Sequence, residues 1–301
     1  MTSREEKIKV ATGSGFELEV PRSYKQLMEK AEAEIESSLA KYPKALKLWR
    51  LLKDDAEVNA DWDMADYIAV AKLKYNDHGE VHAKIVAANA LKMLDLLLEA
   101  GVLPDIMKEH AGDEDDEHLV VMAAALLHDI GNQVHRHEHP LHSTYLAIPV
   151  LNRLLPHVYQ DAEKMYEIRG HILHAIRVHG ADVKDLTMEA SLVGIADGTD
   201  MTKGRGRLAF DTGNINIHTV SALSIEKVEI AKGAEKPIEI RIEMSNSAGI
   251  FQVQETLVPK LTGSPLEDHV DIIAITMPEG GEDSRIVQKL IIKGGKLAPK
   301  N

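Results

Sequence analysis

The chain has 301 residues and a formal charge of −13, because 48 acidic side chains outnumber 35 basic ones. It contains no cysteine, which excludes disulfides, thiolate-ligated zinc, iron–sulfur clusters and thiol catalysis. The acidic balance argues against long nucleic acid as a partner, because non-specific binding to nucleic acid needs basic surface.

The N-terminal ten residues, MTSREEKIKV, lack the apolar stretch of a secretory signal peptide. No part of the sequence offers the roughly 18 consecutive apolar residues of a membrane-spanning helix. The longest apolar run, 119–127, is typical of a buried helix instead. We therefore expect a cytoplasmic protein without a membrane partner.

Up to about residue 215 the apolar side chains recur at helical spacing. The longest such pattern begins at Glu80 and stops at Gly101, and Pro104 follows, which is typical of a helix end. Helices are expected over 22–40, 43–53, 61–74, 80–100, 117–130, 141–156, 160–179 and 186–201.

Beyond this point apolar and polar residues alternate, as they do in half-buried strands. The alternation predicts a ββαββ unit, with strands over 221–232, 237–244, 269–277 and 285–293 and an amphipathic helix over 250–261. The expected fold is therefore mostly α, followed by a small α+β domain. We expect a helical extension over 1–75, a helical metal-binding domain over 76–215 and the α+β domain over 216–301.

Histidine is the abundant residue: there are 15 in the chain, and 13 of them lie between His78 and His179. His78 and His82 are four residues apart and therefore share a helix face. His171, His174 and His179 span roughly 140° of one helix, so two or three of them can face a common cavity. Structural or surface roles are expected for His110, His118, His157, His218 and His269.

His128 and Asp129 end the most apolar predicted helix. A carboxylate there is costly to bury unless it is paired or bound to a metal. Asp197 lies in a second apolar stretch, LVGIADGTD. Neutral imidazole and carboxylate are ligands of Mn, Fe, Co, Ni and Zn, so the sequence predicts one or two divalent transition-metal ions.

The order of these residues resembles that of the HD-domain metal-dependent phosphohydrolases. The string LLHDIGN is very similar to the LLHDIGK signature of that family. The other elements of the family are resembled by HAKIVAANAL (82–91), HPLHSTYLAIPVL (139–151), IRVH (176–179) and IADGTDM (195–201). The resemblance covers about residues 76–205, and neither the N-terminal helices nor the C-terminal unit carries it.

This resemblance implies an HD-type helical bundle in which Asp129 bridges the principal metal to a second one. One or two histidines of the segment 171–179 would complete the second site. The implied ligands are His82, His128, Asp129, His139, His171, His179 and Asp197. The implied catalytic residues are Asp129, His78, His174, Lys203 and Arg205.

The activity implied by the resemblance is hydrolysis of a phosphomonoester or phosphodiester by metal-activated hydroxide. His78 or His174 would protonate the leaving group. Asn132 stands where the family often has a lysine that assists charge at the phosphate, so Lys203 and Arg205 are expected to supply that charge. The acidic net charge favours a small, nucleotide-like substrate.

Two other functions stay open. The same ligand order resembles the mixed-valent di-iron oxygenases of the wider superfamily, which cleave C–H or C–P bonds. Alternatively, the chain is a regulatory or ligand-binding module in which the C-terminal α+β unit is the sensor. A homo-oligomer is compatible with the amphipathic helices and the exposed sheet face.

Overall fold

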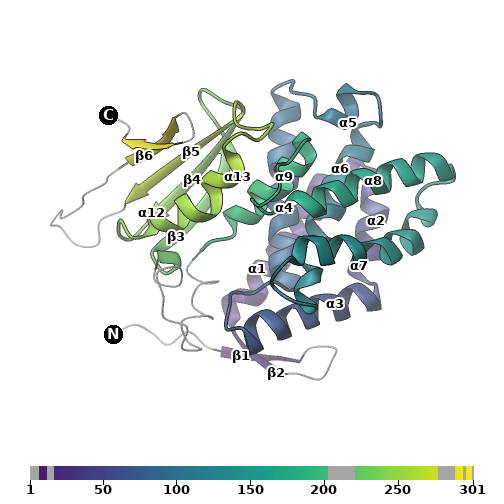
Figure 1. Ribbon diagram of the computed structural model, residues 1–301, viewed down its shortest axis with the longest axis horizontal. Helices are drawn as coiled ribbons and strands as arrows, with labels where there is room; N and C mark the ends of the chain where they lie inside the picture. The colour runs from purple at the N-terminus through teal and green to yellow at the C-terminus, as the bar shows by residue number, and fades with distance from the viewer. Residues whose placement is uncertain (1–6, 12–16, 203–220, 277–288, 294–295, 300–301) are drawn as a thin grey trace.

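The computed structural model describes residues 7–11, 17–202, 221–276, 289–293 and 296–299, and the side chains over 26–202 and 221–276. Helices form one side of the molecule and a β-sheet forms the other (Figure 1). Among the described helices, none has both the length and the apolar character needed to cross a lipid bilayer. The predicted class, mostly helical with a small C-terminal sheet, is confirmed.

The N-terminal segment begins with an antiparallel hairpin of β1 (Lys7–Ala11) and β2 (Glu17–Pro21), which the sequence analysis did not predict. The next elements are α1 (Arg22–Ser38), the short η1 (Leu39–Lys41), α2 (Pro43–Lys53), α3 (Ala56–Asp66) and the π-helical η2 (Tyr67–Lys72). Helix α3 begins five residues before the predicted start because Asp55 caps it, accepting hydrogen bonds from the backbone N–H groups of Glu57 and Val58.

Five central helices agree with the predicted ones to within a few residues: α4 (Glu80–Glu99), α6 (Glu114–Leu127), α7 (His139–Leu154), α8 (Ala162–Val178) and α9 (Met188–Thr199). The short elements α5 (Asp105–Lys108) and η3 (Ile130–Gln133) were not predicted, and η4 (Leu155–His157) continues α7. Helix α6 is buried along nearly its whole length, between α2, α4, α8 and α9. Trp62 of α3 donates its indole N–H to the carbonyl of Leu126 at 2.9 Å, so the C-terminal end of α6 is held in the core.

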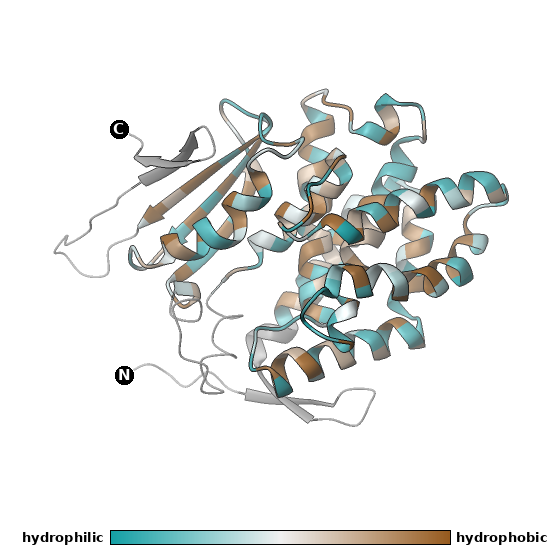
Figure 2. Ribbon diagram, in the orientation of Figure 1, coloured by the Kyte–Doolittle hydropathy of each residue, from teal (hydrophilic) through white to brown (hydrophobic). Residues whose placement is uncertain are grey.

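Helices α1 to α3 share one hydrophobic core with the later helices. Trp49 and Trp62 are both fully or almost fully buried in it. Hydrophobic residues gather where the helices face one another and along the sheet (Figure 2). The predicted domain boundaries at residues 75 and 215 stay predictions, because residue 215 lies outside the described residues and the core is continuous across residue 75.

The C-terminal unit has the strand order β3-β4-β5-β6-β7. Strands β4 and β5 are parallel, and the helical segment 249–261 connects them; the other neighbouring pairs are antiparallel. The element order agrees with the predicted ββαββ, and β7 is one strand more. The elements are β3 (Ile225–Lys232), β4 (Ile238–Met244), α12 (Gly249–Gln252), η5 (Val253–Leu257), α13 (Val258–Leu261), β5 (Val270–Thr276), β6 (Lys289–Lys293) and β7 (Lys296–Pro299).

Glu117 is a carboxylate inside the helical core. It lies on α6 with 0% of its surface exposed, and neither of its oxygens has a hydrogen-bond donor among the described residues. Burial raises the pKa of this carboxyl well above its usual range, and the negative charge of Glu189 on α9 raises it further. Folding therefore favours the protonated form of Glu117.

Because the pKa of Glu117 is raised in the folded state, its contribution to stability is present below the unfolded pKa of about 4.3 and is lost as the pH rises. We expect Glu117→Gln to increase the free energy of unfolding by about 1–3 kcal/mol at pH 8 and to change it little at pH 4. Urea unfolding at both pH values measures this difference, with the exposed Glu34→Gln as control. A Glu117→Gln protein less stable than the parent at pH 8 would contradict the prediction.

Candidate metal centre

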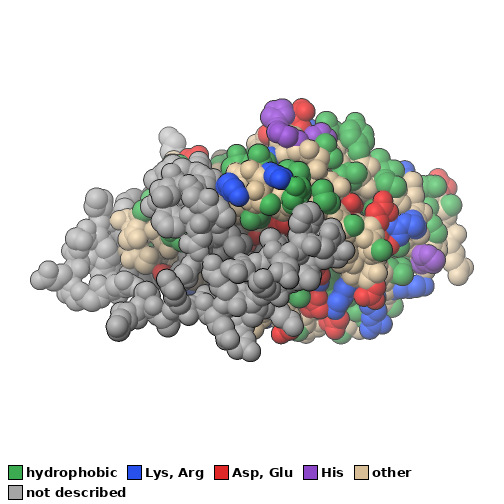
Figure 3. Space-filling view, turned by 90° about the horizontal axis from the view of Figure 1, so that it is seen from below, with side chains coloured by type: hydrophobic (Ala, Val, Ile, Leu, Met, Phe, Trp, Pro, Cys, Tyr) green, Lys and Arg blue, Asp and Glu red, His purple; other side chains and the backbone are tan. Residues whose placement is uncertain are grey.

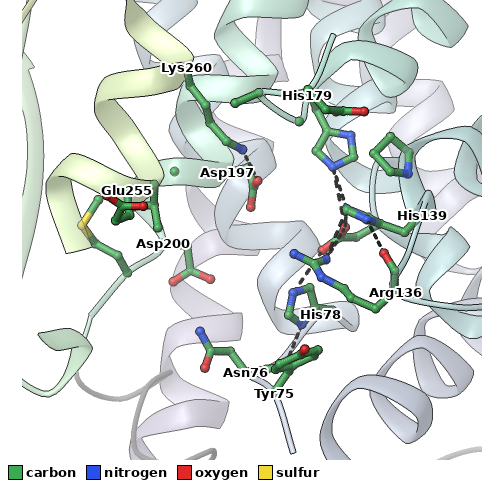
Figure 4. A pocket seen from close by; sticks show the side chains of 18 of the residues that line it. Tyr75, Asn76, His78, Arg136, His139, His179, Asp197, Asp200, Glu255 and Lys260 are labelled. Carbon is green, nitrogen blue, oxygen red and sulfur yellow. Dashed lines mark hydrogen bonds and ion pairs between the residues drawn. The ribbon is translucent and has the colours of Figure 1, made fainter. Parts of the chain in front are cut away.

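A cavity of about 720 Å³ opens where the helices of the bundle meet the segment 249–261 (Figure 4). The segment before α4, the ends of α6, α8 and α9 and the start of α7 all reach it. Five of the predicted site residues line it: His78, Asp129, His139, His179 and Asp197. His82 and His128 lie beneath them, fully buried, within 3.5 Å of Asp129 Oδ2.

Hydrogen bonds at Nδ1 hold each of the five histidines in place. The acceptors are carbonyl or carboxylate oxygens, which carry no hydrogen, so each Nδ1 is the protonated nitrogen and donates. In the neutral imidazole Nε2 is then the unprotonated nitrogen, and it faces the cluster. The pairs are His82 with Asp200 Oδ2 at 2.7 Å, His128 with Ala125 O at 2.7 Å, His179 with Ile176 O at 2.7 Å, His139 with Arg136 O at 3.0 Å and His78 with Asn76 O at 2.6 Å.

Two pairs of Nε2 atoms approach each other closely. Those of His82 and His128 are 3.2 Å apart, and those of His139 and His179 are also 3.2 Å apart. Two neutral imidazoles with Nδ1 protonated cannot hydrogen-bond to each other through Nε2, whereas a metal ion can bind both nitrogens. Arg136 Nη1 also lies 3.2 Å from His139 Nε2, as a donor. Metal–nitrogen bonds of about 2.1 Å at angles of ~90–110° separate two ligand atoms by roughly 3.0–3.4 Å. The observed spacing therefore fits two ligands of one metal ion.

Asp129 lies between the two imidazole pairs. Its Oδ2 is 3.4 Å from His82 Nε2 and 3.5 Å from His128 Nε2, whereas its Oδ1 is 3.1 Å from His139 Nε2 and 3.7 Å from His179 Nε2. Burial alone would raise the pKa of Asp129, but the surrounding imidazoles, those of His128 and His78 first, hold it well below its usual range. A buried, ionised carboxylate with one oxygen toward each pair is placed to bridge two ions.

Asp197 on α9 completes the first ligand set. Its Oδ1 is 3.2 Å from His82 Nε2 and 3.8 Å from His128 Nε2. Burial opposes its ionisation, but Lys260 and the two histidines lower the pKa of the carboxyl well below its usual range. Two groups could therefore hold a metal ion: His82, His128 and Asp197, and His128, Asp129 and His179.

The turn after Asp129 depends on Gly131 and Asn132. A Cβ on Gly131 would lie 2.2 Å from the carbonyl oxygen of His139, so only glycine lets the start of α7 approach this closely. The side chain of Asn132 is buried and donates to the Asp129 carbonyl at 2.9 Å. Arg136 Nη1 donates to Asn132 Oδ1 at 3.2 Å. Residue 132 therefore has a structural role here.

The structure does not bring the remaining predicted residues to the cluster. His171 and His174 lie on α8 but do not line the cavity. His171 is eight residues from His179, which is about 12 Å along the helix axis, so the two cannot share a metal ion. His174 lies near Asp185 and Glu189 instead, and burial lowers its pKa. Lys203 and Arg205 lie outside the described residues.

Three residues of the site were missed by the sequence analysis. Asp200 is three residues beyond Asp197 and orients His82, so the IADGTDM string held a signal for it. Arg136 lines the cavity beside His139, with Nη1 3.9 Å from Asp129 Oδ1. Lys260 reaches the site from the C-terminal unit, and no local pattern in the sequence points to it.

Comparison with known proteins finds one clear relative. The chain is 46% identical over 218 residues to "Uncharacterized protein MJ1020" of Methanocaldococcus jannaschii, an alignment that covers 72% of this chain and 84% of the relative. The chain belongs to the family of MJ1020. No protein-family model matches the chain, and no solved structure matches it. Because MJ1020 is itself uncharacterized, membership of the MJ1020 family assigns no reaction.

We expect Asp129→Asn to weaken metal binding by more than about 100-fold, because losing a bridging ligand costs more than the 10–100-fold lost with an outer partner. Equilibrium dialysis against Mn²⁺ or Zn²⁺ followed by elemental analysis measures the bound metal per chain. Asp268→Asn changes an exposed carboxylate that does not line the cavity and is the matched control. Unchanged metal content in the Asp129→Asn protein would reject the assignment of this residue.

Proposed function

We propose that the protein is a metal-dependent phosphohydrolase with an HD-type dinuclear centre, acting on a small, nucleotide-like phosphomonoester or phosphodiester. The observation that carries the proposal is the placement of Asp129 between two imidazole pairs whose Nε2 atoms are each 3.2 Å apart. One set, His82, His128 and Asp197, would hold the first ion. The other, His139 and His179, would hold the second, and Asp129 would contribute an oxygen to each.

Nitrogen and carboxylate oxygen are the donor atoms, so Mn, Fe, Co, Ni and Zn are the candidate metals. A divalent ion in such a set supplies a nucleophilic water near neutral pH and stabilises negative charge on the phosphoryl oxygens. The chain itself fixes the orientation of the ligands: Asp200 holds His82, and backbone carbonyls hold His128 and His179.

The cavity volume of about 720 Å³ is in the range of small-molecule sites. Arg136 and Lys260 face it from opposite walls (Figure 4). A guanidinium binds phosphate oxygens through two parallel hydrogen bonds, so Arg136 takes the role of the lysine that residue 132 lacks. His78 Nε2 lies 4.0 Å from Asp129 Oδ2, and in its imidazolium form, with both ring nitrogens protonated, His78 is placed to give the Nε2 proton to the leaving oxygen.

Metal-loaded protein is expected to hydrolyse a generic phosphoester, either bis-p-nitrophenyl phosphate or p-nitrophenyl phosphate. Release of p-nitrophenol is followed with Mn²⁺, Fe²⁺, Co²⁺, Ni²⁺ or Zn²⁺ added to metal-free protein, and a panel of cyclic and linear nucleotides follows. Asp129→Asn protein is the background control. If protein that demonstrably binds metal hydrolyses none of these esters, the proposed reaction is wrong.

Arg136→Met is expected to raise KM for the phosphoester about 10-fold or more while changing kcat less, because it removes a charge that binds the substrate phosphate. Steady-state kinetics on the best substrate of the panel separate the two constants. Arg50→Met, an exposed arginine of α2 outside this cavity, is the control. A fall in kcat with unchanged KM would contradict a binding role for Arg136.

The second candidate function is that of a di-iron oxygenase. Two features are compatible with it: Asp129 has one oxygen toward each imidazole pair, and residue 132 is an asparagine with a structural role instead of the family's lysine. Protein purified without oxygen and loaded with Fe²⁺ separates the two. An oxygen-reactive mixed-valent iron signal, with no phosphoester hydrolysis under any metal, would favour the oxygenase.

A further inference from the structure

We propose that Lys260 of the C-terminal unit is a positioning residue of the metal centre, because its ammonium holds Oδ2 of Asp197 and leaves only Oδ1 to face the imidazoles. The inference rests on the metal centre of the proposed function but not on the reaction. It assigns to the C-terminal unit a part in building the site.

The two oxygens of Asp197 have different surroundings. Oδ1 lies 3.2 Å from His82 Nε2 and 3.8 Å from His128 Nε2. Oδ2 accepts a hydrogen bond from Lys260 Nζ. In Figure 4 the lysine extends from α13 across the cavity wall to this carboxylate. The lysine side chain is only 12% exposed, so its ammonium is largely withdrawn from water at the point of contact.

Packing determines how far Lys260 reaches. Its helical segment is anchored by Val253, Leu257 and Leu261, which are all buried in the common core. The segment lies directly against α9 at Gly198, the residue after Asp197: a Cβ there would be 3.1 Å from both Leu257 Cδ1 and the Thr256 carbonyl oxygen. The contact between Lys260 and Asp197 is therefore part of a fixed helix–helix interface.

The bond has a definite consequence for coordination. A carboxylate with both oxygens free can bind an ion through one or both of them, or rotate away from it. Asp197 with Oδ2 engaged offers one oxygen in one orientation, which leaves a coordination position open for water or substrate. Partners of this kind typically contribute 10–100-fold to metal affinity. Alternatively, the ammonium competes with the metal ion for Asp197 and weakens metal binding. Removing the ammonium would then raise the metal affinity, whereas a positioning role predicts that the affinity falls.

The test is Co²⁺ binding to the full chain, followed by visible absorption, which reports both affinity and coordination geometry. Lys260→Met keeps the length of the side chain and removes its charge, and Lys260→Arg keeps a cationic donor. Lys227→Met changes an exposed lysine of the same unit, on β3, and is the matched control. Far-ultraviolet circular dichroism checks folding, and Lys260→Gln replaces Lys260→Met if the latter does not fold.

We expect Lys260→Met to bind Co²⁺ about 10–100-fold more weakly with an altered absorption spectrum, and Lys260→Arg and Lys227→Met to stay within about threefold of the parent. Equal or tighter binding by Lys260→Met overturns the inference and makes the lysine a competitor. An equal loss in Lys260→Arg also overturns it, because packing and not the ammonium would then be responsible. A parent that binds Co²⁺ but hydrolyses no ester rejects only the reaction, whereas a parent that binds none rejects the centre itself.

Discussion

The buried charge of Asp129 is the constraint on which the rest of the site depends. A carboxylate at the end of a helix as apolar as α6 loses most of its hydration, and this cost is several kcal/mol unless other groups replace the water. Here imidazoles surround it, with Nε2 atoms of His139 at 3.1 Å and His82 at 3.4 Å. Those imidazoles cannot all be protonated, because five adjacent cations would repel one another. Divalent ions would remove the conflict, since the unprotonated nitrogens and the carboxylate could bind them together.

Hydrogen bonds to carbonyl groups at helix C-termini set the orientation of two of the imidazoles. His128 and His179 each follow the last residue of a helix, and each returns its Nδ1–H to a carbonyl three residues earlier. Such carbonyls have no partner within the helix, so one bond satisfies the helix end and sets the histidine ring. The exposed histidines of the next loop, His135 and His137, have no such anchor; histidine side chains gather on the surface in Figure 3. Proximity along the chain to Asp129 therefore does not suffice to make a ligand.

The sequence pattern predicted the features that depend on local periodicity. It did not predict those that depend on contacts between distant segments of the chain. The helices and the HisAsp pair follow from apolar spacing and from the cost of a buried carboxylate. His171 was wrongly grouped with His179 because angular position was considered without the rise along α8, which separates the two rings. The hairpin β1–β2 was missed although KIKV (7–10) and ELEV (17–20) alternate polar and apolar residues, the pattern of a half-buried strand. Lys260 could not be found at all, because its role arises from packing between segments 60 residues apart that only the folded chain brings together.

Two cationic side chains line the cavity: Arg136, from the loop before α7, and Lys260, from α13 of the C-terminal unit. The proposed phosphate site needs positive charge beyond the metals, and the neutral amide of Asn132 closes the turn after Asp129 instead. Arg136, four residues further on in the loop before α7, donates to the amide oxygen of Asn132 and reaches the cavity. Asn132, which occupies the position of the family's lysine, therefore holds the Arg136 guanidinium. Lys260 faces it from the opposite wall, bound to Asp197. The side chain of Arg136 is 38% exposed, whereas that of Lys260 is 12% exposed and bound to a carboxylate. In the proposed function, substrate binding and ligand positioning therefore fall to different residues.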